Sequence, residues 1–361
     1  MNANNILFIG IGQAGGNLCE QVCKTNRRIT SVVFNTSMTD MENLNHVKTI
    51  AFPDVDGAGR NREQAKKYLK DEAALIVDTI NSYKMKDTVF IAFAMGGGTG
   101  SGMSTVLLNL LYSLDKDKVY HIIPILPFEK ETKGMQENAI QCWKELSTLF
   151  DKNIGAIYLI DNNKRKTKQA INREFADLFN LYLDCTNHHV DGVLDGRELE
   201  ILGTSKGLTA IIDIKRHLDE PKEIIDNVIK DSIFVSNTDI IENIGISAPS
   251  EFNREYLEDK LKPFGESFEG YSEKNSILIL SGMKATNKAI EKTYDIYTYK
   301  KLQLEENRKL AEQKLAEEDL ELSLEITKKP ITKKCSTIAD EVKIDDVLDN
   351  SDDFWDKIMN M

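Results

Sequence analysis

The chain has 361 residues, 41% of them hydrophobic, and a formal net charge of −12 that results from 46 basic and 58 acidic residues. This length and apolar content suffice for one large domain or two ordinary ones, and the acidic balance argues against a general nucleic-acid-binding or membrane-surface protein. The five cysteines are scattered, the N-terminus lacks the pattern of a signal peptide and no apolar run approaches ~18 residues, so we expect a cytoplasmic protein with reduced thiols and no membrane span.

Apolar strands alternate with helices over residues 1–165. We predict helices at 16–25, 61–83 and 104–114, and strands at 5–12, 31–36, 87–98, 119–128 and 155–161. Apolar strands separated by helices are typical of a parallel sheet that is covered on both faces. The pattern therefore predicts an α/β domain over residues 1–165, whose ligand is indicated by the loops discussed below.

The rest of the chain divides into four further segments. A central helix is expected at 166–190, followed at 191–283 by a smaller second α/β domain that carries the catalytic loop. Its strands are predicted at 207–215, 232–237, 243–250 and 276–283. A long charged helix is expected at 284–327, because this segment holds strong helix formers and no Gly or Pro. Residues 328–361 are polar and acidic, which predicts a flexible tail for partner binding.

Two glycine-rich loops follow predicted strands and lead into predicted helices. The first loop is "GIGQAGGN" (Gly10–Asn17) and the fourth loop is "GGGTGSG" (Gly96–Gly102). Free backbone amides at a helix N-terminus bind anions. Two such loops at the carboxyl edge of one sheet favour a polyphosphate, with the hydroxyls of Thr99 and Ser101 as extra donors. The alternative is a pair of tight turns without a ligand, but a turn needs only one or two glycines.

The kind of nucleotide is not fixed by the first loop alone. Gly10–Gly15 fits the dinucleotide fingerprint GxGxxG, which is a weak signal by itself. A dinucleotide site also requires an acidic residue at the end of the second strand, where this chain has Asn35. A Walker-type phosphate loop requires a Lys that follows neither loop. An NAD-dependent oxidoreductase stays open as an alternative.

The fourth loop resembles the phosphate loop of the tubulin/FtsZ superfamily, and "GQAG" (Gly12–Gly15) resembles the first nucleotide loop of tubulin. The resemblance covers roughly residues 5–283. It implies GTP or GDP as the ligand. It also implies nucleotide contacts from the following residues: Gly12, Gln13, Ala14, Gly15, Gly16, Asn17, Asn35, Gly57, Ala58, Gly59, Gly96, Gly97, Gly98, Thr99, Gly100, Ser101, Asn162, Asn172 and either Glu129 or Glu131.

The other loops match the superfamily in chain order. The second loop, "FNTS" (34–37), places Asn35 near the ribose, and the third loop, "DGAGRN" (56–61), lies near the γ-phosphate. The fifth loop, "LPFEKE" (126–131), offers Glu129 or Glu131 to the ribose, and the match does not decide between them. In the sixth loop, "IDNN" (160–163), Asn162 is expected to bond the guanine, and Asn172 in "INR" is expected to read its edge as well.

Two departures from the superfamily pattern precede the central helix. The stretch between Asn162 and Asn172 is much shorter than in tubulin or FtsZ, so the intervening helix is expected to be truncated or missing. Lys168 stands where the superfamily often has an aromatic residue that stacks on the base, which weakens the expectation of base stacking.

The seventh loop, "LDGRE" (194–198), resembles the catalytic loop of the superfamily and implies that Asp195 and Glu198 are the catalytic acids. Taken alone, two carboxylates at i and i+3 are usually solvated or capping residues. These acids lie far along the chain from the phosphate loops, so they reach the γ-phosphate only if subunits stack head to tail. Such a contact builds filaments. On this reading the carboxylates orient the attacking water and a Mg²⁺ ion, and the sequence assigns no residue as a metal ligand.

The chain ends distinguish branches of the superfamily. A long charged helix and an acidic tail replace the linker and short docking peptide of FtsZ, and the pattern is most similar to the TubZ branch. This resemblance implies a filament that moves plasmid or phage DNA through a DNA-binding adaptor of the TubR type, held by the tail, with no direct DNA or membrane binding. The alternatives are an FtsZ-like division GTPase and a filament that binds nucleotide without hydrolysing it.

Overall fold

The computed structural model describes residues 1–185, 192, 194–215, 225–272 and 276–328. The chain separates into two units, Met1–Leu304 and Glu305–Met361. Within the described residues, no helix is both long and apolar enough to cross a membrane.

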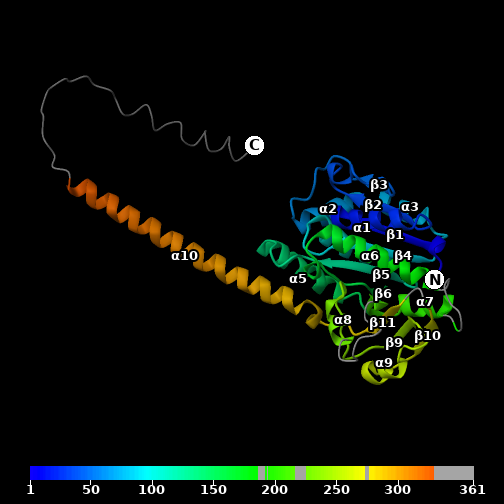
Figure 1. Ribbon diagram of the computed structural model, residues 1–361. Coiled ribbons are helices and arrows are strands. Elements are labelled where there is room, and N and C mark those ends of the chain that lie inside the picture. Colours follow the sequence, from blue (N-terminus) through cyan, green and yellow to red (C-terminus); the bar gives the residue numbers. More distant parts are fainter. Residues whose placement is uncertain (186–191, 193, 216–224, 273–275, 329–361) are drawn as a thin grey trace, which may run out of the picture. The chain divides into compact units, whose positions relative to one another are not determined.

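The first unit is built on one mixed sheet in which parallel pairs dominate (Figure 1). Its strand order is β10-β9-β11-β8-β6-β5-β4-β1-β2-β3, and β7 pairs with β5. The strands are β1 Ile6–Ile11, β2 Thr30–Asn35, β3 Lys48–Ala51, β4 Thr88–Ala94, β5 Tyr120–Leu126, β6 Ile154–Ile157, β7 Ile160–Asp161, β8 Gly207–Asp213, β9 Asn243–Ala248, β10 Ser267–Tyr271 and β11 Ile277–Met283. Only the pairs that β11 forms with β8 and β9 are antiparallel among these strands. The predicted parallel α/β architecture is confirmed.

The helices pack on this sheet in two groups. One group joins α1 to α6, and the other joins α4 to α2 and α5. The helices are α1 Gly12–Thr25, α2 Arg62–Asp71, α3 Ala73–Asn81, α4 Thr99–Leu114, α5 Lys133–Ser147, α6 Lys168–Leu183, α7 Gly196–Thr204, α8 Ile225–Asp231, α9 Arg254–Leu261 and α10 Glu291–Lys328. The short 3-10 turns η1 Ala3–Asn5, η3 Asn162–Lys164 and η7 Asn287–Ile290 precede β1, α6 and α10.

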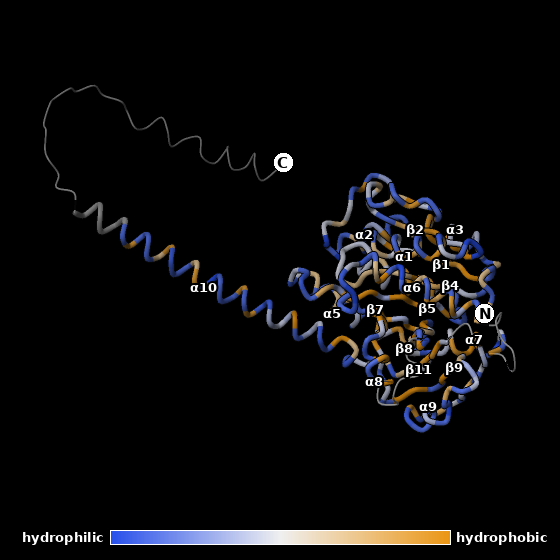
Figure 2. Tube along the Cα trace, in the orientation of Figure 1, coloured by the Kyte–Doolittle hydropathy of each residue, from blue (hydrophilic) through white to orange (hydrophobic). Residues whose placement is uncertain are grey.

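Aromatic side chains in the core hold α6 against the sheet. The ring of Phe179 on α6 lies 5.5 Å from Phe8 on β1 and 5.3 Å from Phe90 on β4, and all three side chains are buried. Figure 2 shows the same concentration of hydrophobic residues in the strands, whereas α10 is mainly hydrophilic. Because burial of such side chains is the main favourable term in folding, this cluster fixes where α6 begins at the sheet edge.

Several element predictions need correction. Residues 232–237 form only an isolated bridge, Ile160 to Phe234, because the partner strand β7 ends at Asp161. The predicted helix 61–83 divides into α2 and α3, since the backbone of Glu72 leaves the helical conformation. The central helix α6 ends at Leu183, where Asp184 has ψ near 0°, and residues 186–191 lie outside the described part.

The predicted domain boundaries stay predictions. The pairing of β6 with β8 joins the strands of the two expected α/β domains into one sheet. The expected helix at 284–327 corresponds to α10, whose first residue is Glu291. Residues 329–361, nearly all of the expected tail, lie outside the described residues.

Candidate active site

Six of the seven loops lie at one edge of the sheet. The first to fifth loops follow the carboxyl ends of β1, β2, β3, β4 and β5 in turn, and the sixth follows β7. These strands are parallel neighbours in the sheet, so their carboxyl ends share an edge. Ligands of open parallel sheets bind at this edge, and the predicted nucleotide residues are therefore brought together there.

The glycines of these loops serve two distinct purposes. A Cβ on Gly15 would lie 2.2 Å from the Ala92 carbonyl oxygen, and one on Gly98 would lie 2.8 Å from Arg60 Cα, so both positions require bare backbone for packing. A Cβ on Gly97, Gly57 or Gly59 would meet no atom within 4 Å. Gly57 and Gly59 have φ values of 80° and 55°, so their backbone conformation by itself favours glycine. Gly97 has no such constraint and leaves open space where the phosphates are expected.

The helices that follow the first and fourth loops begin without a side-chain cap. The residues that precede them, Ile11 for α1 and Gly98 for α4, make no capping hydrogen bond from their side chains. By contrast, Asn61 caps α2 and Thr167 caps α6. The helices α3 and α5 also begin without such a cap, so a missing cap alone marks no site. Because α1 and α4 also follow the two glycine-rich loops, their free first amides are suited to bind an anion.

The second, third and fourth loops are tied to one another. Thr36 Oγ1 and Thr99 Oγ1 are 2.9 Å apart and share a hydrogen bond, while the amide of Gly57 donates to the Thr36 carbonyl oxygen at 2.8 Å. Asn35 is buried, and within the described part of the chain its Nδ2 has no hydrogen-bond partner. An unpartnered buried donor is costly, so this amide fits a position that a polar ligand satisfies. The open glycines, uncapped helices and orphan amide together fit a nucleotide.

The two glutamates of the fifth loop have different environments. Glu131 accepts from the Phe128 amide at 3.0 Å through Oε2 and pairs with Lys168 Nζ at 2.7 Å through Oε1. The carboxylate of Glu129 pairs with Lys292 of α10, and this hydrogen bond raises the pKa of Lys292. Lys168 is thus part of an ion pair at the position where the superfamily often has a base-stacking aromatic residue.

The two expected guanine-reading residues flank the start of α6. Asn162 is buried in η3, and Asn172 is half-buried in the second turn of α6. Only η3 precedes α6, as the shortened sequence indicates. Asn180 bonds with Asn26 at the far end of α1, so the two helices run in the same direction. Asn172 is two turns before Asn180, about 12 Å closer to the loops.

Gln13 lies at the start of α1 and its Nε2 donates to Asp40 Oδ1 at 2.8 Å. The other predicted residues of the first loop, Ala14, Gly16 and Asn17, occupy the first turns of α1. A Cβ on Gly16 would lie 2.9 Å from Val33, which makes this glycine a packing residue of α1 on β2.

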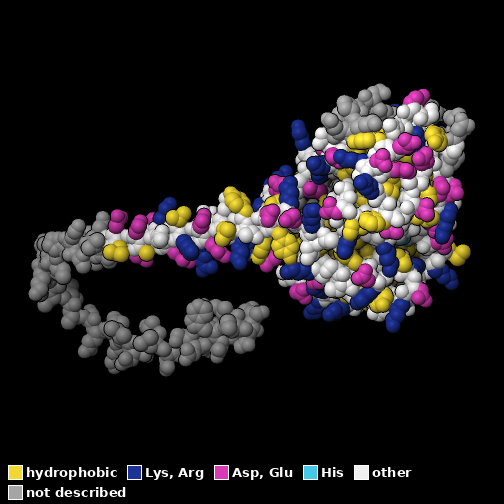
Figure 3. Space-filling view, turned by 90° about the horizontal axis from the view of Figure 1, so that it is seen from below, with side chains coloured by type: hydrophobic (Ala, Val, Ile, Leu, Met, Phe, Trp, Pro, Cys, Tyr) yellow, Lys and Arg dark blue, Asp and Glu magenta, His cyan; other side chains and the backbone are white. Residues whose placement is uncertain are grey.

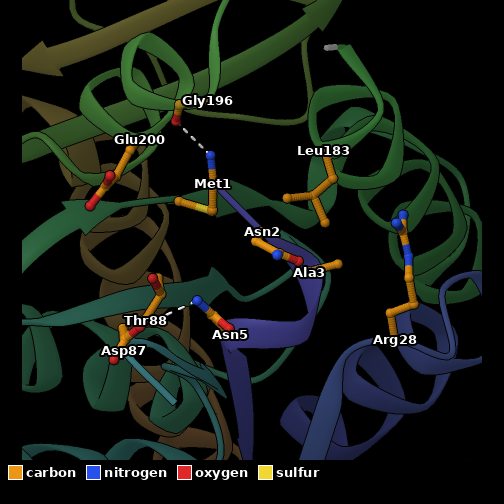
Figure 4. Close-up of a pocket in the computed structure, with 10 residues that line it drawn as sticks. All are labelled: Met1, Asn2, Ala3, Asn5, Arg28, Asp87, Thr88, Leu183, Gly196 and Glu200. Atoms are coloured by element: carbon orange, nitrogen blue, oxygen red, sulfur yellow. Dashed lines mark hydrogen bonds between the residues drawn. The ribbon is translucent and has the colours of Figure 1, made fainter. Parts of the chain in front are cut away.

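The seventh loop lies at the amino end of β1, on the side of the sheet opposite the other six loops; Figure 4 shows Gly196 of this loop beside Met1. The ammonium group of Met1, which precedes β1, donates to the Gly196 carbonyl oxygen at 2.7 Å, and both residues line a pocket of about 530 Å³. The first loop follows the other end of β1, a strand of six residues. At ~3.3 Å per residue, roughly 20 Å separate Gly196 from the phosphate loops. One subunit therefore does not bring Asp195 and Glu198 to its own nucleotide loops.

The two acids form a capping box at the start of α7. Asp195 Oδ1 accepts from the amides of Arg197 at 2.7 Å and Glu198 at 2.8 Å, and Glu198 Oε2 accepts from the Asp195 amide at 2.9 Å. The sequence had offered capping as the alternative to catalysis, and the cap is present. Asp195 is exposed and Glu198 half-exposed, so a cap and a contact with another molecule are compatible. Among the described residues, no group of three His, Cys, Asp or Glu side chains is arranged to hold a metal.

Sequence reasoning missed an ion pair between the buried Arg62 and the partly exposed Glu145, behind the phosphate loop. The guanidinium of Arg62 on α2 pairs with Glu145 on α5 at 2.7 Å and donates to the Ser101 carbonyl oxygen at 3.2 Å. Burial opposes ionisation of Glu145, but hydrogen bonds from Arg62, Lys66 and Thr105 keep its pKa below the ordinary value. The sequence gives little indication of this pair, because Arg62 reads as an ordinary charged residue at the start of a helix.

Comparisons with known proteins agree with this geometry. The model of the tubulin/FtsZ family GTPase domain matches residues 5–167. The chain is 30% identical to the tubulin-like protein TubZ of a Clostridium botulinum C phage over 99% of both chains. It is similar to the structure of tail-truncated TubZ from C. botulinum phage c-st, with a TM-score of 0.77, 29% identity and coverage of 83% of this chain and 99% of that one. A protofilament structure of Bacillus thuringiensis TubZ shares the fold, with a TM-score of 0.71, 16% identity and coverage of 85% and 94%.

Proposed function

The chain belongs to the tubulin/FtsZ family of GTPases, and from this premise we propose that it assembles head to tail into filaments with GTP and hydrolyses the nucleotide within them. The observation that carries the proposal is the division of the site between opposite edges of the sheet. The nucleotide loops occupy one edge, while Asp195 and Glu198 occupy the other, next to Gly196 and Met1. If the edge of one subunit that carries Asp195 and Glu198 packs on the edge of the next subunit that carries the nucleotide loops, the site is complete. Such a head-to-tail contact does not close into a ring, so subunits add on to form a filament.

Each half has its own part in the mechanism. The amides at the starts of α1 and α4, with Thr99, would bind the phosphates and stabilise their charge. Asp195 and Glu198 of the neighbouring subunit would orient the attacking water, so that hydrolysis follows assembly. Mg²⁺, when bound, would neutralise phosphate charge; it prefers one or two carboxylates together with phosphates and waters, which fits the few acids of this site.

Electron microscopy of the purified protein with GTP, GDP and a slowly hydrolysed GTP analogue tests assembly directly. We expect filaments with GTP, more persistent ones with the analogue and few with GDP. Membership of this family of GTPases rules out the NAD-dependent oxidoreductase that the first loop alone had left open. Filaments that form without phosphate release would support a non-hydrolysing scaffold.

The base preference tests the guanine-reading residues. Asn162 and Asn172 each offer a donor and an acceptor to the purine edge, so we expect GTP to be preferred over ATP. Asn172→Asp, at the half-buried position, should relax or abolish this preference without unfolding the chain, and Asn162→Asp should add a stability loss because that site is buried. Competition binding with GDP and ADP measures the preference. Equal affinity of the wild type for both would contradict the assignment.

We also propose that the filament moves plasmid or phage DNA through a DNA-binding adaptor of the TubR type. The support is the similarity to TubZ along nearly the whole chain and the acidic composition of residues 328–361, which lie almost entirely outside the described residues. Removing this segment should preserve GTP hydrolysis and filaments and eliminate adaptor binding, which co-sedimentation measures. If filaments are lost as well, the segment takes part in assembly instead. If the protein has an FtsZ-like division role, neither the full chain nor the shortened chain should co-sediment adaptor-bound DNA.

A further inference from the structure

Asn138 on α5 lies against the backbone of two nucleotide loops. Its Nδ2 is 3.0 Å from the Arg60 carbonyl oxygen in the third loop, and 3.2 Å and 3.4 Å from the carbonyl oxygens of Gly96 and Gly97 in the fourth loop. We propose that Asn138 is a positioning residue, which fixes the third loop on the fourth loop and thereby sets the affinity for the terminal phosphate of a nucleotide. This inference rests on the proposed binding of GTP at the loop edge.

The three carbonyl oxygens determine how the Asn138 amide is oriented. Only the NH₂ end of this side chain donates, so it faces the loops, because a carbonyl oxygen in its place would face three other carbonyl oxygens. The NH₂ group has two N–H bonds, and three acceptors from two loops share them. The half-buried side chain therefore joins the loops to each other as well as to α5.

The fourth loop is enclosed between α5 and the third loop. A Cβ on Gly96 would lie 3.2 Å from the Met135 carbonyl oxygen in the first turn of α5, and a Cβ on Gly98 would lie 2.8 Å from Arg60 Cα. The glycine between these two positions has open space in place of a Cβ. Asn138 thus bridges the two sides that enclose the place where phosphates are expected.

The bond to the third loop is made at a strained residue. Arg60 has a φ of 62°, a left-handed conformation that is unfavourable for a residue with a Cβ. Such backbone persists where its surroundings hold it in place, and the 3.0 Å bond from Asn138 to the Arg60 carbonyl oxygen is the shortest of the three. Without this bond, Arg60 is expected to relax and the third loop to shift on the fourth.

The order of the strands indicates which part of a nucleotide the third loop meets. The strands adjoin in the order β5-β4-β1-β2-β3, and β7 pairs with β5. In the proposed function the guanine lies at Asn162, after β7, and the phosphates lie at α4 and α1, after β4 and β1. A longer phosphate chain then extends toward β2 and β3, and the third loop follows β3. Its position should therefore matter more for a triphosphate than for a diphosphate.

The start of α2 is anchored separately, so the effect of Asn138 is local. Gln141 and Glu145 lie one and two turns further along α5, and their side-chain oxygens accept from the Arg62 guanidinium at 3.2 Å and 2.7 Å. Arg62 is the first residue of α2, directly after the third loop. These bonds remain when Asn138 is replaced, and α2 is expected to keep its place on α5.

Asn138→Ala tests this inference through the binding of GDP and of a slowly hydrolysed GTP analogue, measured below the protein concentration at which assembly begins. This variant should weaken binding of the analogue about three- to tenfold, the range expected for one lost hydrogen bond, and binding of GDP less than twofold. Asn138→Asp keeps the shape of the side chain but cannot donate, so its affinity for the analogue should fall at least as far. Wild-type affinity in Asn138→Asp would show that packing, and not donation, matters, and would overturn the inference.

Asn153→Ala is the matched control for a purely structural amide. Asn153 is buried and its Nδ2 donates to the Leu108 carbonyl oxygen at 3.0 Å, next to the amino end of β6 and away from the nucleotide loops. Its loss should lower the thermal midpoint and leave the ratio of the two affinities unchanged. Asn138→Ala should change this ratio with a smaller loss of thermal midpoint.

Arg60→Gly provides a second measurement, because glycine adopts a left-handed backbone without strain. In a double-mutant cycle, Asn138→Ala should weaken binding of the analogue less in the Arg60→Gly background than in the wild type. Equal weakening of GDP and analogue by Asn138→Ala, or the same loss in both backgrounds, would overturn the inference. Failure of the wild type to bind either guanine nucleotide would instead overturn the proposed function, so the two failures are distinguishable.

Discussion

At the scale of single residues, the glycines of the loops separate packing from binding. Gly97→Ala places a methyl group in open space and should leave the thermal midpoint nearly unchanged, yet lower nucleotide affinity at least tenfold, because the group occupies the side expected to face phosphate. Gly15→Ala should destabilise the fold by about 1–3 kcal/mol, since its Cβ would overlap the Ala92 carbonyl. Gly134→Ala, also in open space but within α5, is the control: it should leave nucleotide affinity unchanged and raise the thermal midpoint slightly, because Ala favours the helix over Gly.

Thr99 gives a second prediction at this scale. Its hydroxyl shares a hydrogen bond with Thr36, so it joins the second and fourth loops as well as offering a donor to phosphate. Thr99→Ala should weaken binding of a GTP analogue about two- to tenfold, the range expected for one hydrogen bond, and lower turnover. Thr99→Ser keeps the hydroxyl and should retain most of the affinity. Calorimetric titration of both variants decides the role, and unchanged affinity and turnover in Thr99→Ala would exclude it.

The residues that the sequence predicted and those that it missed differ in how far along the chain their contact partners lie. The glycines and Thr99 lie within one short stretch whose pattern is recognisable by itself. Lys300 and Glu131 are 169 positions apart, and only the packing of α10 beside the fifth loop brings them together. The ion pairs of Glu131 with Lys168 and of Glu129 with Lys292 are likewise long-range, so the sequence alone did not show them.

At the scale of elements, β5 and β6 meet at a buried histidine. His121 Nδ1 accepts from the Ala156 amide at 3.0 Å, and a Cβ on Gly155 would lie 2.7 Å from the imidazole. Burial lowers the pKa of His121 to about 4. Below about pH 6.5 His121 binds a proton in the unfolded chain, whereas in the folded chain it stays neutral down to about pH 4. The free energy of unfolding therefore decreases as the pH is lowered from about 6.5 to about 4.

This linkage predicts a measurable slope. The His121 contribution approaches about 1.4 kcal/mol per pH unit between about pH 6 and pH 4. His121→Gln, whose amide oxygen can still accept from Ala156, should be less stable at pH 7 but lose less stability on acidification. Urea unfolding of both proteins at pH 7, 6 and 5 isolates the histidine from carboxylates such as Glu145, which are common to both. Parallel pH dependences would show that His121 does not titrate in this way.

Element prediction succeeded where a strand is long and apolar and failed where pairing is limited. The strands predicted at 207–215 and 276–283 form β8, Gly207–Asp213, and β11, Ile277–Met283. The equally apolar stretch around Phe234 finds a partner at one residue only, because β7 comprises just Ile160 and Asp161. Strand propensity describes a fit to a sheet surface, so it does not reveal whether a neighbouring strand extends far enough to pair with.

At the scale of the whole molecule, the charge pattern of α10 differs from that of a buried helix. Acidic and basic side chains are interspersed along it in Figure 3, and Leu310, Leu315 and Leu320 are exposed between them. A helix that is polar all round is stabilised by pairs such as Arg308 and Glu312, four residues apart, and this pattern was visible in the sequence.

The capping box changes how the shared active site has to be tested. Replacing Glu198 by Ala removes a carboxylate and also the acceptor that holds the Asp195 amide, so reduced turnover in that variant has two explanations. Glu198→Gln keeps an acceptor at the third position of α7, where Gln is a normal capping-box residue, and removes only the charge. We therefore expect Glu198→Gln to fold, bind GTP and assemble like the wild type, but to hydrolyse GTP at least a hundredfold more slowly and to form persistent filaments.

The dependence on a second chain is the decisive part of this prediction. The nucleotide loops and the acids lie at opposite edges of the sheet. If the acids act on a neighbour's nucleotide, as proposed, each working site needs two chains, and wild-type phosphate release should rise more steeply than linearly with protein concentration. A small fraction of Glu198→Gln mixed into the wild type should enter its filaments and slow their disassembly out of proportion to its share. Arg197→Ala is the neighbouring control: Arg197 is exposed on the same loop and its side chain pairs with Glu200, so its loss should leave the capping box and the acids in place. If specific activity is flat across concentrations and Glu198→Gln merely dilutes the wild type, the site is complete within one subunit and Asp195 and Glu198 serve only to cap α7.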